Sequence, residues 1–431
     1  MISLIVVLAI VISIALGYKT KINTGLFAIS FAYIIGCFFL DLKANDVIGM
    51  WPIRIFFVIF AVSLFYNFAL VNGTLEKLSQ HLLYSCRKAP HLLPFAIFFA
   101  AAFIAGLGAG FFTVMAFFAP ITLLLCKKTG MSKLVGAVAV NYGALGGANF
   151  MTSASGVVFK SLIETAGYTD SAFAYTTSIF IVSIIIPVIV ISGLVLFSKD
   201  GKKLGKGIEI QEPEAFEPKQ KTNLRLIFLM VGIVLVAPIL NIIFPENTLI
   251  NFVNSKMDIG LIAIIFSVVA MMLDLADEKT VIAKVPWNTL IMICGVGMLI
   301  SVAIKAGTID IMAGWIGGNI PAFAVPIVLS IVGGIMSFFS STVGVVAPAL
   351  FPIVPSIAET TGLNPMALFT CVIIGAQATA ISPFSSGGSL ILGSCATDEE
   401  RSEMFPKLLF NGVVLCLGAA IVASIIIAVV M

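Results

Sequence analysis

The apolar run from Leu134 to Ile163 most constrains how this chain can fold, because it is too long for one straight crossing. A continuous helix of that length rises roughly 45 Å, whereas the hydrocarbon core of a bilayer is about 30 Å thick. Gly143, Gly146 and Gly147 predict a break in the helix. The polar residues that follow are Asn149, Thr152, Ser153 and Ser155. Broken backbone is tolerated in a membrane where it is buried in protein or lines a wet cavity, as at transporter binding sites.

The composition places the chain among membrane proteins. Hydrophobic residues make up 60% of its 431 residues, charged residues 10%, and the mean hydropathy is +1.14. The net charge of +3 is spread over loops, which argues against nucleic-acid binding. The seven cysteines are scattered through apolar runs, as small core residues are, and do not suggest a disulfide framework. We expect the opening run to be a retained first span, because it lacks a basic start and a cleavage motif.

The apolar runs predict ten crossings and two re-entrant hairpins. The hairpins are expected at 92–126 and 321–358, where the middle of the run is rich in Gly or Ser. Two short full spans in each place are the alternative. Most of the 24 Lys and Arg residues fall on one side of this topology. That asymmetry places the connection after residue 197 in the cytoplasm and both termini outside, in a cytoplasmic (inner) membrane.

Recurring motifs predict two halves, 1–197 and 224–431, joined by a polar cytoplasmic linker at 198–223 that we expect to be a flexible tether. The matched landmarks, at a nearly constant spacing, are Trp51 and Trp287, Gly73 and Gly307, Pro120 and Pro348, and Gly130 and Gly362. An odd number of crossings in each half would insert the second copy upside down. The expected fold is an all-α polytopic membrane protein with two inverted-topology repeats, each of five transmembrane helices plus one re-entrant hairpin. The broken helices are expected at 134–166 and 364–396.

Four uncharged interruptions, two hairpin tips and two breaks, are the candidate site. Pro383 and Gly387-Gly388 predict the second break. The residues expected to bind substrate are Asn149, Thr152, Ser153, Ser155, Ser382, Ser385 and Ser386. Those expected to bind a cation are Thr113, Gly110, Ser340, Ser341, Thr342, Gly147 and Thr379.

The chemistry of these residues suits two guests. Half-helix N-termini favour an anionic carboxylate, and freed carbonyls with hydroxyls favour Na⁺. For each residue taken singly, helix packing is an equal alternative, because small residues allow close approach of helices in membranes. His81, Cys86 and His91 in a basic loop and Glu164 at a span end are expected to be solvated, and Arg54 at the start of a span is expected to be a snorkelling anchor. The sequence shows neither a nucleophile–base pair nor a phosphate loop, so we expect no enzyme and no cofactor other than Na⁺ as a coupling ion.

Three motifs carry a resemblance to a known family: Ser341-Thr342 with Ala347-Pro348, Gly146-Gly147-Ala148-Asn149 running into Thr152-Ser153, and Ser382-Pro383-Phe384-Ser385-Ser386. The chain resembles the ion transporter superfamily, on the divalent anion/sodium symporter side. A tip that reads Ser340-Ser341-Thr342 in place of Ser-Asn-Thr makes the malonate/dicarboxylate carriers the closest match. The resemblance implies a homodimer, an elevator mechanism, and a di- or tricarboxylate substrate carried with sodium.

These observations together predict a secondary active transporter of a small dicarboxylate, similar to malonate or succinate, coupled to Na⁺ or H⁺. One alternative is an inorganic-ion exchanger of the same superfamily, for sodium and protons or for an oxyanion. A passive channel, or a membrane subunit that transports nothing, would also be consistent with these spans.

Overall fold

The protein is described by a computed structural model that covers residues 2–85, 92–197, 212–244 and 246–430. Every element within these residues is a helix, so the expected all-α class is confirmed. The helices form two compact units, which are described separately below. Unit 1 comprises Met1–Phe56, Phe159–Ile186 and Trp287–Met431, and unit 2 comprises Phe57–Val158 and Pro187–Pro286.

Eight described helices are long and apolar enough to cross a bilayer, and the chain is an integral, multi-pass membrane protein. These are Ile2–Thr20, Ile53–Val71, Leu93–Ala116, Ala172–Leu196, Pro218–Asn241, Trp287–Lys305, Thr342–Thr361 and Asp398–Val430. The apolar helix Thr24–Phe38 is shorter, with 15 residues. The predicted runs at 134–166 and 364–396 are each divided into two shorter helices, as expected of broken spans.

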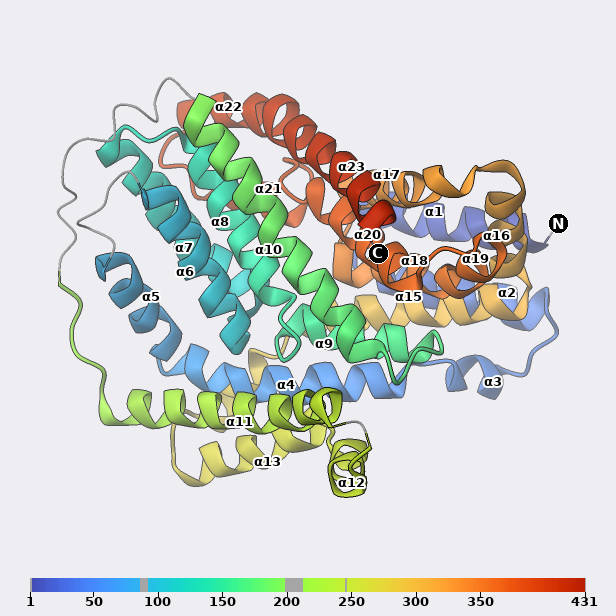
Figure 1. Cartoon of the computed structure of the whole chain (residues 1–431), viewed down its shortest axis with the longest axis horizontal. Helices are drawn as coiled ribbons and strands as arrows, with labels where there is room; N and C mark the ends of the chain where they lie inside the picture. The colour runs from blue at the N-terminus through green and yellow to red at the C-terminus, as the bar shows by residue number, and fades with distance from the viewer. Residues whose placement is uncertain (1, 86–91, 198–211, 245, 431) are drawn as a thin grey trace. The chain divides into compact units, whose positions relative to one another are not determined.

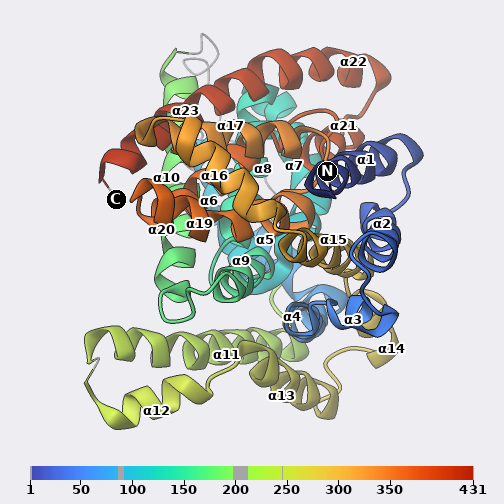
Figure 2. The ribbon, with the colours of Figure 1, turned by 90° about the vertical axis from the view of Figure 1, so that its right-hand side faces the viewer.

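Unit 2 holds the first predicted hairpin and the first predicted break. Its helices are α4 (Ile53–Val71), α5 (Thr74–Ser85), α6 (Leu93–Ile104), the π-helical η2 (Ala105–Ala109), α7 (Gly110–Thr129), α8 (Lys133–Ala148), the start of α9 (Ala154–Thr165), α11 (Pro218–Ile243), α12 (Thr248–Lys256), α13 (Ile259–Met272) and α14 (Glu278–Ala283). The helices α12 and α13 meet at an angle of 67°, and both pack against α11 (Figure 2).

The helices α6 and α7 form a helical hairpin that packs along α8 (Figure 1). A Cβ at Gly147 of α8 would lie 2.0 Å from the carbonyl oxygen of Ala102 in α6, so this contact requires glycine. The chain turns between α6 and α7 at Gly108 and Gly110, where φ is +97° and +69°. The helices α6 and α7 therefore pack as a pair joined at this turn, and a re-entrant hairpin that returns to the same side of the membrane stays a prediction.

The glycines of α8 have a different role from the expected one. Gly143, Gly146 and Gly147 lie inside α8, which continues to Ala148, and they do not break it. A Cβ at Gly143 would lie 2.3 Å from the carbonyl oxygen of Phe98. The two outer glycines therefore allow α6 to pack closely, and the break comes after them.

Unit 1 holds the second predicted hairpin and break. Its helices are α1 (Ile2–Thr20), α2 (Thr24–Phe38), α3 (Ala44–Gly49), the first part of α10 (Ala172–Phe197), α15 (Trp287–Lys305), α16 (Thr308–Asn319), η4 (Ala322–Ala324), α17 (Val325–Phe338), the π-helical η5 (Thr342–Val346), α18 (Ala347–Leu350), η6 (Phe351–Ile353), α19 (Val354–Thr361), α20 (Pro365–Ala378), α21 (Ser386–Gly393), α22 (Asp398–Pro406), η7 (Lys407–Gly412) and α23 (Val413–Val430). The contact between α17 and α20 is the most extensive in this unit.

Two tight glycine contacts of unit 2 recur in unit 1. In each case the glycine and the residue it contacts are shifted along the chain by the same number of residues. Gly143 against Phe98 in unit 2 corresponds to Gly375 against Ser330 in unit 1, where a Cβ would lie 2.0 Å from the carbonyl oxygen. After the breaks, a Cβ at Gly156 would lie 2.0 Å from the oxygen of Phe150. The same construction at Gly388 gives 2.1 Å to the oxygen of Ser382. The local geometry around the two broken helices is therefore repeated.

The end of the predicted linker packs against α5 in unit 2. Lys77 Nζ donates to the carbonyl oxygen of Ala215 at 3.2 Å, and the ring of His81 stacks on Phe216 with centroids 4.9 Å apart. The expectation of a free tether is therefore wrong for residues 212–217, while 198–211 lie outside the described residues. His81 lies on α5 and not in a loop, and Cys86 and His91 also lie outside the described residues.

Candidate functional site

The first break lies between Ala148, the end of α8, and Ala154, the start of α9. The tip of the first hairpin packs directly against it. Ser153 Oγ donates a hydrogen bond of 2.6 Å to the carbonyl oxygen of Ala105, the first residue of the π-helical tip. This bond holds the tip to the break.

The residues predicted to bind substrate at this break are buried. The exposed fraction is 0% for Asn149, Thr152 and Ser153 and 7% for Ser155. Thr152 Oγ1 has no hydrogen-bond partner among the described residues. A buried hydroxyl without a partner is costly, so Thr152 is suited to contact a guest that enters the break.

The residues predicted to bind a cation near the first tip are less directly placed. Gly147 packs against α6, where its missing side chain is needed for helix contact. Gly110 opens α7 with a positive φ, and Thr113 lies one turn later, half-buried. The structure thus brings together three parts of unit 2: the break, the tip at 105–110, and Tyr66 of α4.

Tyr66 is a residue that the sequence analysis missed. Its ring, which is 2% exposed, lies against Gly108 of the tip, and its hydroxyl lies 3.5 Å from the carbonyl oxygen of Thr152. The signal in the sequence was a polar tyrosine followed by Asn67 within the apolar run 53–71. Buried tyrosines need a partner for the hydroxyl, so such a residue in a span predicts a contact with polar backbone.

The second break lies between Ala378, the end of α20, and Ser386, the start of α21. Ser385 caps α21 and its Oγ lies 2.6 Å from the carbonyl oxygen of Ala380. Ser382 Oγ accepts a bond of 3.2 Å from the Phe384 N–H. These hydroxyls fix the path of the broken backbone, whereas Ser386 in the first turn of α21 is exposed.

The second hairpin is tied to the second break from within unit 1. Thr379 Oγ1 donates to the carbonyl oxygen of Gly334 in α17 at 2.8 Å. The rings of Phe339 and Phe384 are in contact with centroids 5.8 Å apart, and Tyr18 of α1 contacts Phe339 at 5.3 Å. Rings from the tip and the break therefore pack on each other, and a tyrosine from α1 packs against them.

The hydroxyls predicted to bind a cation at the second tip form local hydrogen bonds. Ser341 Oγ accepts from the Gly344 N–H at 3.0 Å, and Ser340 Oγ donates to the Met336 carbonyl at 2.5 Å. Thr342 Oγ1 lies 2.9 Å from the hydroxyl of Ser337. A cation here would use the carbonyls and the remaining lone pairs of these oxygens, since each hydroxyl oxygen can accept more than one bond.

The charge balance near the breaks is as the sequence indicated, with one correction farther along α9. Residues 147–156 and 379–389 contain no Asp, Glu, His, Lys or Arg. Glu164 was expected to be solvated, but its side chain is 7% exposed and lies between two cations. Its oxygens lie 2.9 Å from Arg54 Nη2 and 2.9 Å from Lys160 Nζ. Ion pairing offsets the desolvation of this carboxylate, and Arg54 is more than a snorkelling anchor.

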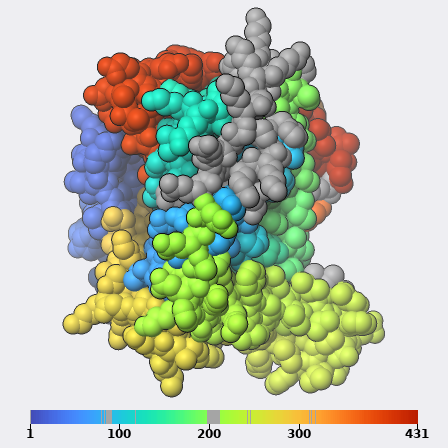
Figure 3. Space-filling model, turned by 90° about the vertical axis from the view of Figure 1, so that its left-hand side faces the viewer, coloured from blue at the N-terminus to red at the C-terminus, as the bar shows by residue number. Residues whose placement is uncertain are grey.

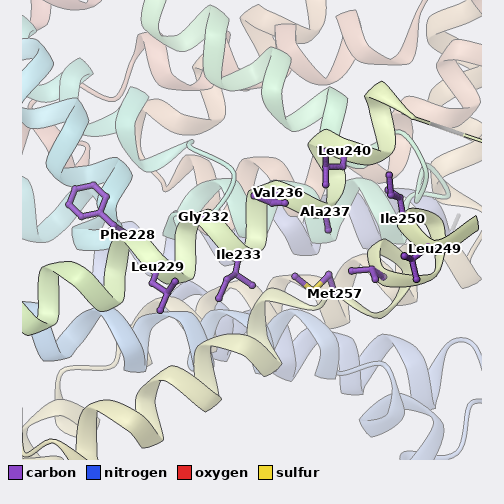
Figure 4. A pocket seen from close by; sticks show the side chains of 11 residues that line it. Phe228, Leu229, Gly232, Ile233, Val236, Ala237, Leu240, Leu249, Ile250 and Met257 are labelled. Carbon is purple, nitrogen blue, oxygen red and sulfur yellow. The ribbon is translucent and has the colours of Figure 1, made fainter. Parts of the chain in front are cut away.

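One groove of about 530 Å³ lies on α11 and α12 in unit 2 (Figure 4). Apolar side chains such as Phe228, Ile233 and Leu249 line it together with Gly232. The yellow-green surface of these helices is visible in the lower part of Figure 3. The groove shares no residue with either break, and its apolar lining matches the acyl chains around a membrane span.

Comparison with family models then decides the classification. The model "Sodium:sulfate symporter transmembrane region" matches residues 126–429, and "Dicarboxylate carrier protein MatC N-terminus" matches residues 1–148. The chain belongs to the sodium:sulfate symporter family. As a member of this family it is a cation-coupled anion transporter and not an enzyme. Comparison with curated proteins gives no match.

Two solved structures of transporters share the fold of this symporter-family chain. The Alcanivorax borkumensis YdaH transporter is 13% identical, with a TM-score of 0.57 and 89% of each chain covered. Neisseria gonorrhoeae MtrF, described as one of a class of antimetabolite efflux pumps, is 15% identical, with a TM-score of 0.55. That match covers 92% of this chain and 84% of MtrF. At these identities the likeness concerns the fold alone.

Proposed function

We propose that this member of the sodium:sulfate symporter family is a secondary active transporter of a small dicarboxylate, similar to malonate or succinate. The observation that carries the proposal is the match of residues 1–148 to the N-terminus of a dicarboxylate carrier. Those residues contain the whole first hairpin and α8, up to the first break. The segment that resembles a dicarboxylate carrier therefore includes the first hairpin tip and ends just before the first break.

The chemistry of the breaks supports an anionic substrate. Each break begins a new half-helix, α9 or α21, and the first N–H groups of a helix lack intrahelical partners and can bind a carboxylate, although Ser385 caps the Gly388 N–H in α21. With no fixed cation in the breaks, a dianion needs accompanying positive charge, which Na⁺ supplies. Backbone carbonyls at the π-helical tips are suitable ligands for that ion. The exposed Ser386, the unpartnered Thr152 hydroxyl and Asn149 are the side chains we assign to the substrate.

The repeated geometry of the two units supports an inverted-repeat, elevator-type carrier. Matched glycine contacts beside and after both breaks are expected if one ancestral unit was duplicated. We propose that each break contributes to substrate binding and that two such chains assemble as a homodimer in the inner membrane. Movement of the tips and breaks past a fixed scaffold would then alternate access to the site.

Uptake by purified protein in proteoliposomes tests the substrate and the coupling. Radiolabelled malonate, succinate and sulfate are supplied under an inward sodium gradient, and again with sodium replaced by choline at pH 6 and pH 8. The expected result is saturable dicarboxylate uptake that requires a sodium or proton gradient. Uptake that does not saturate would instead indicate a channel, and no uptake of any anion would contradict transport.

Inorganic oxyanion transport is the second candidate, favoured by the description of the family model that matches residues 126–429. Sulfate is also a small dianion, and the same N–H groups and hydroxyls can bind it. The uptake assay separates the two, because an oxyanion carrier would take up sulfate and be inhibited poorly by excess malonate. The lack of acidic residues in either break argues against sodium/proton exchange.

A further inference from the structure

Tyr66 of α4 contacts both parts of the first candidate site. Its ring atoms occupy the space where a Cβ of Gly108 would be, at a distance of 2.1 Å. Its hydroxyl lies 3.5 Å from the carbonyl oxygen of Thr152 in the break. The side chain is 2% exposed, so Tyr66 is enclosed by protein. One buried side chain thus contacts both the hairpin tip and the break.

The backbone of the tip makes this support specific. Gly108 has a φ of +97°, a conformation that side chains rarely adopt, and it lies inside the π-helical segment. The tip can lie flat on the Tyr66 ring only because this residue is glycine. On its other side the tip is held by the bond from Ser153 to Ala105. The tip is therefore held between a ring and a hydrogen bond.

The second hairpin tip is supported in a similar way within unit 1. Gly344 lies in the π-helical segment of that tip, and a Cβ there would be 2.1 Å from Cε of Met292. Met292 belongs to α15, which begins at Trp287, as α4 follows Trp51. In both units a tip glycine thus packs against one long side chain of the span that follows a landmark tryptophan.

We propose that Tyr66 is a positioning residue that keeps the first hairpin tip closed over the break. The proposal rests on the proposed function only in treating the tip and break as part of a transport site. Tyr66 acts through Gly108 and Thr152 and does not itself contact the substrate. Removal of its ring leaves a cavity beneath the tip, so the open form of the tip becomes more populated.

Thiol labelling measures tip opening without any knowledge of the substrate. A cysteine is placed at Ala109, a half-buried tip residue, in full-length protein whose seven native cysteines are replaced. A water-soluble maleimide then labels it at a rate that follows the population of the open tip. Tyr66→Ala should raise this rate by about tenfold, equivalent to about 1.4 kcal/mol of lost closure. Tyr66→Phe, which keeps the ring, should raise it much less.

Phe65→Ala is the matched control, because Phe65 is the neighbouring residue of α4, is fully buried, and contacts Phe266 of α13. It should destabilise the protein without raising the labelling rate. If Tyr66→Ala does not fold, Gly108→Ala provides the same test from the opposite side and should also speed labelling. Equal rates in the Tyr66 and Phe65 variants, or no change in Gly108→Ala, would overturn the proposal.

The uptake assay gives a second readout. Tyr66→Phe should shift the KM for the transported anion or the apparent sodium affinity by several-fold, because it removes the hydroxyl beside the Thr152 carbonyl oxygen. The kcat should change little, because the ring still supports the tip. A change in kcat alone would contradict positioning. If the wild type transports nothing, the labelling result still decides the role of Tyr66, so failure of this inference and failure of the proposed function remain distinguishable.

Discussion

At the scale of single residues, the structure separates hydroxyls that build the site from those that can serve it. Ser153 and Ser385, predicted from the sequence to bind substrate, donate to backbone carbonyls and fix the broken chain. Thr152, with an unpartnered hydroxyl, and Ser386, on the exposed side of α21, remain available. The sequence could not distinguish them, because a serine that caps a helix and a serine that binds a ligand have the same pattern.

Thr152 and Ser153 therefore offer a residue-scale prediction. Thr152→Val keeps the shape and removes a hydroxyl that has no partner, so folding should be unaffected or slightly improved while uptake falls about tenfold or more. Ser153→Ala removes the bond to Ala105 and should lower thermal stability as well as uptake. Uptake kinetics and melting temperatures of both variants measure this. A Thr152→Val variant with normal uptake would remove Thr152 from the site.

Glu164 gives a second prediction at this scale. Glu164→Gln leaves Arg54 and Lys160 without their shared carboxylate, which should cost about 1–2 kcal/mol after allowing for the partial exposure of both cations. The melting temperature of the solubilised protein should fall by a few degrees. Asp170→Asn, at an exposed carboxylate in the loop that follows, is the control and should be neutral. Equal stability of the two variants would mean that the ion pairs contribute nothing.

At the scale of elements, the sequence predicted what depends on length and polarity and missed what depends on packing. Both long apolar runs are divided into two helices, at 149–153 and 379–385, as the limit that a bilayer sets on helix length predicts. The re-entrant hairpins stay a prediction. The short helices α5 and α12 were missed, since neither has the long apolar run that identifies a span. The glycines of α8 were assigned to the break, because closeness to α6 cannot be seen in one sequence.

Glycines after the breaks test the importance of the repeated geometry. Gly388→Ala would place a Cβ 2.1 Å from the Ser382 carbonyl oxygen, and Gly156→Ala one 2.0 Å from that of Phe150. Each should destabilise the protein by about 1–3 kcal/mol, as overpacking does. Gly393→Ala, in the same helix as Gly388 but with open space around it, should be neutral or slightly stabilising. Thermal unfolding compares them, and a neutral Gly388→Ala would contradict the described turn.

The docked end of the linker gives another prediction at this scale. Phe216→Ala removes the ring that stacks on His81 and should release residues 212–217 from α5. Hydrogen–deuterium exchange should become faster in this segment and in α5, because local opening then costs less. Glu212→Ala, at an exposed residue of the same segment, should leave the exchange unchanged. Unchanged exchange in Phe216→Ala would show that the polar contacts of Lys77 and His81 with Glu214 and Ala215 hold the segment without the ring.

At the scale of the whole molecule, the family, the all-α fold and the repeated breaks agree on a cation-coupled anion carrier. This class could be predicted from the sequence, because a helix in lipid is broken only where protein or a water-filled cavity satisfies its backbone. Neither the sequence nor the fold identifies the anion, because a dianion of any chemistry can be held by N–H groups and hydroxyls. The substrate therefore has to be identified by its effect on the folded protein.

Ligand-induced stabilisation makes that identification without a transport assay. A ligand that binds only the folded state adds about 2.7 kcal/mol at 100 times its Kd, so the melting temperature should rise with concentration. We expect malonate or succinate to raise it in sodium, and to raise it less in choline, because the site holds no fixed cation to balance a dianion. Thr152→Val should reduce the shift, whereas Gly393→Ala, outside the break, should preserve it. A shift with sulfate and none with dicarboxylates would instead assign the carrier to inorganic anions. Equal shifts in sodium and in choline would show that anion binding does not depend on sodium.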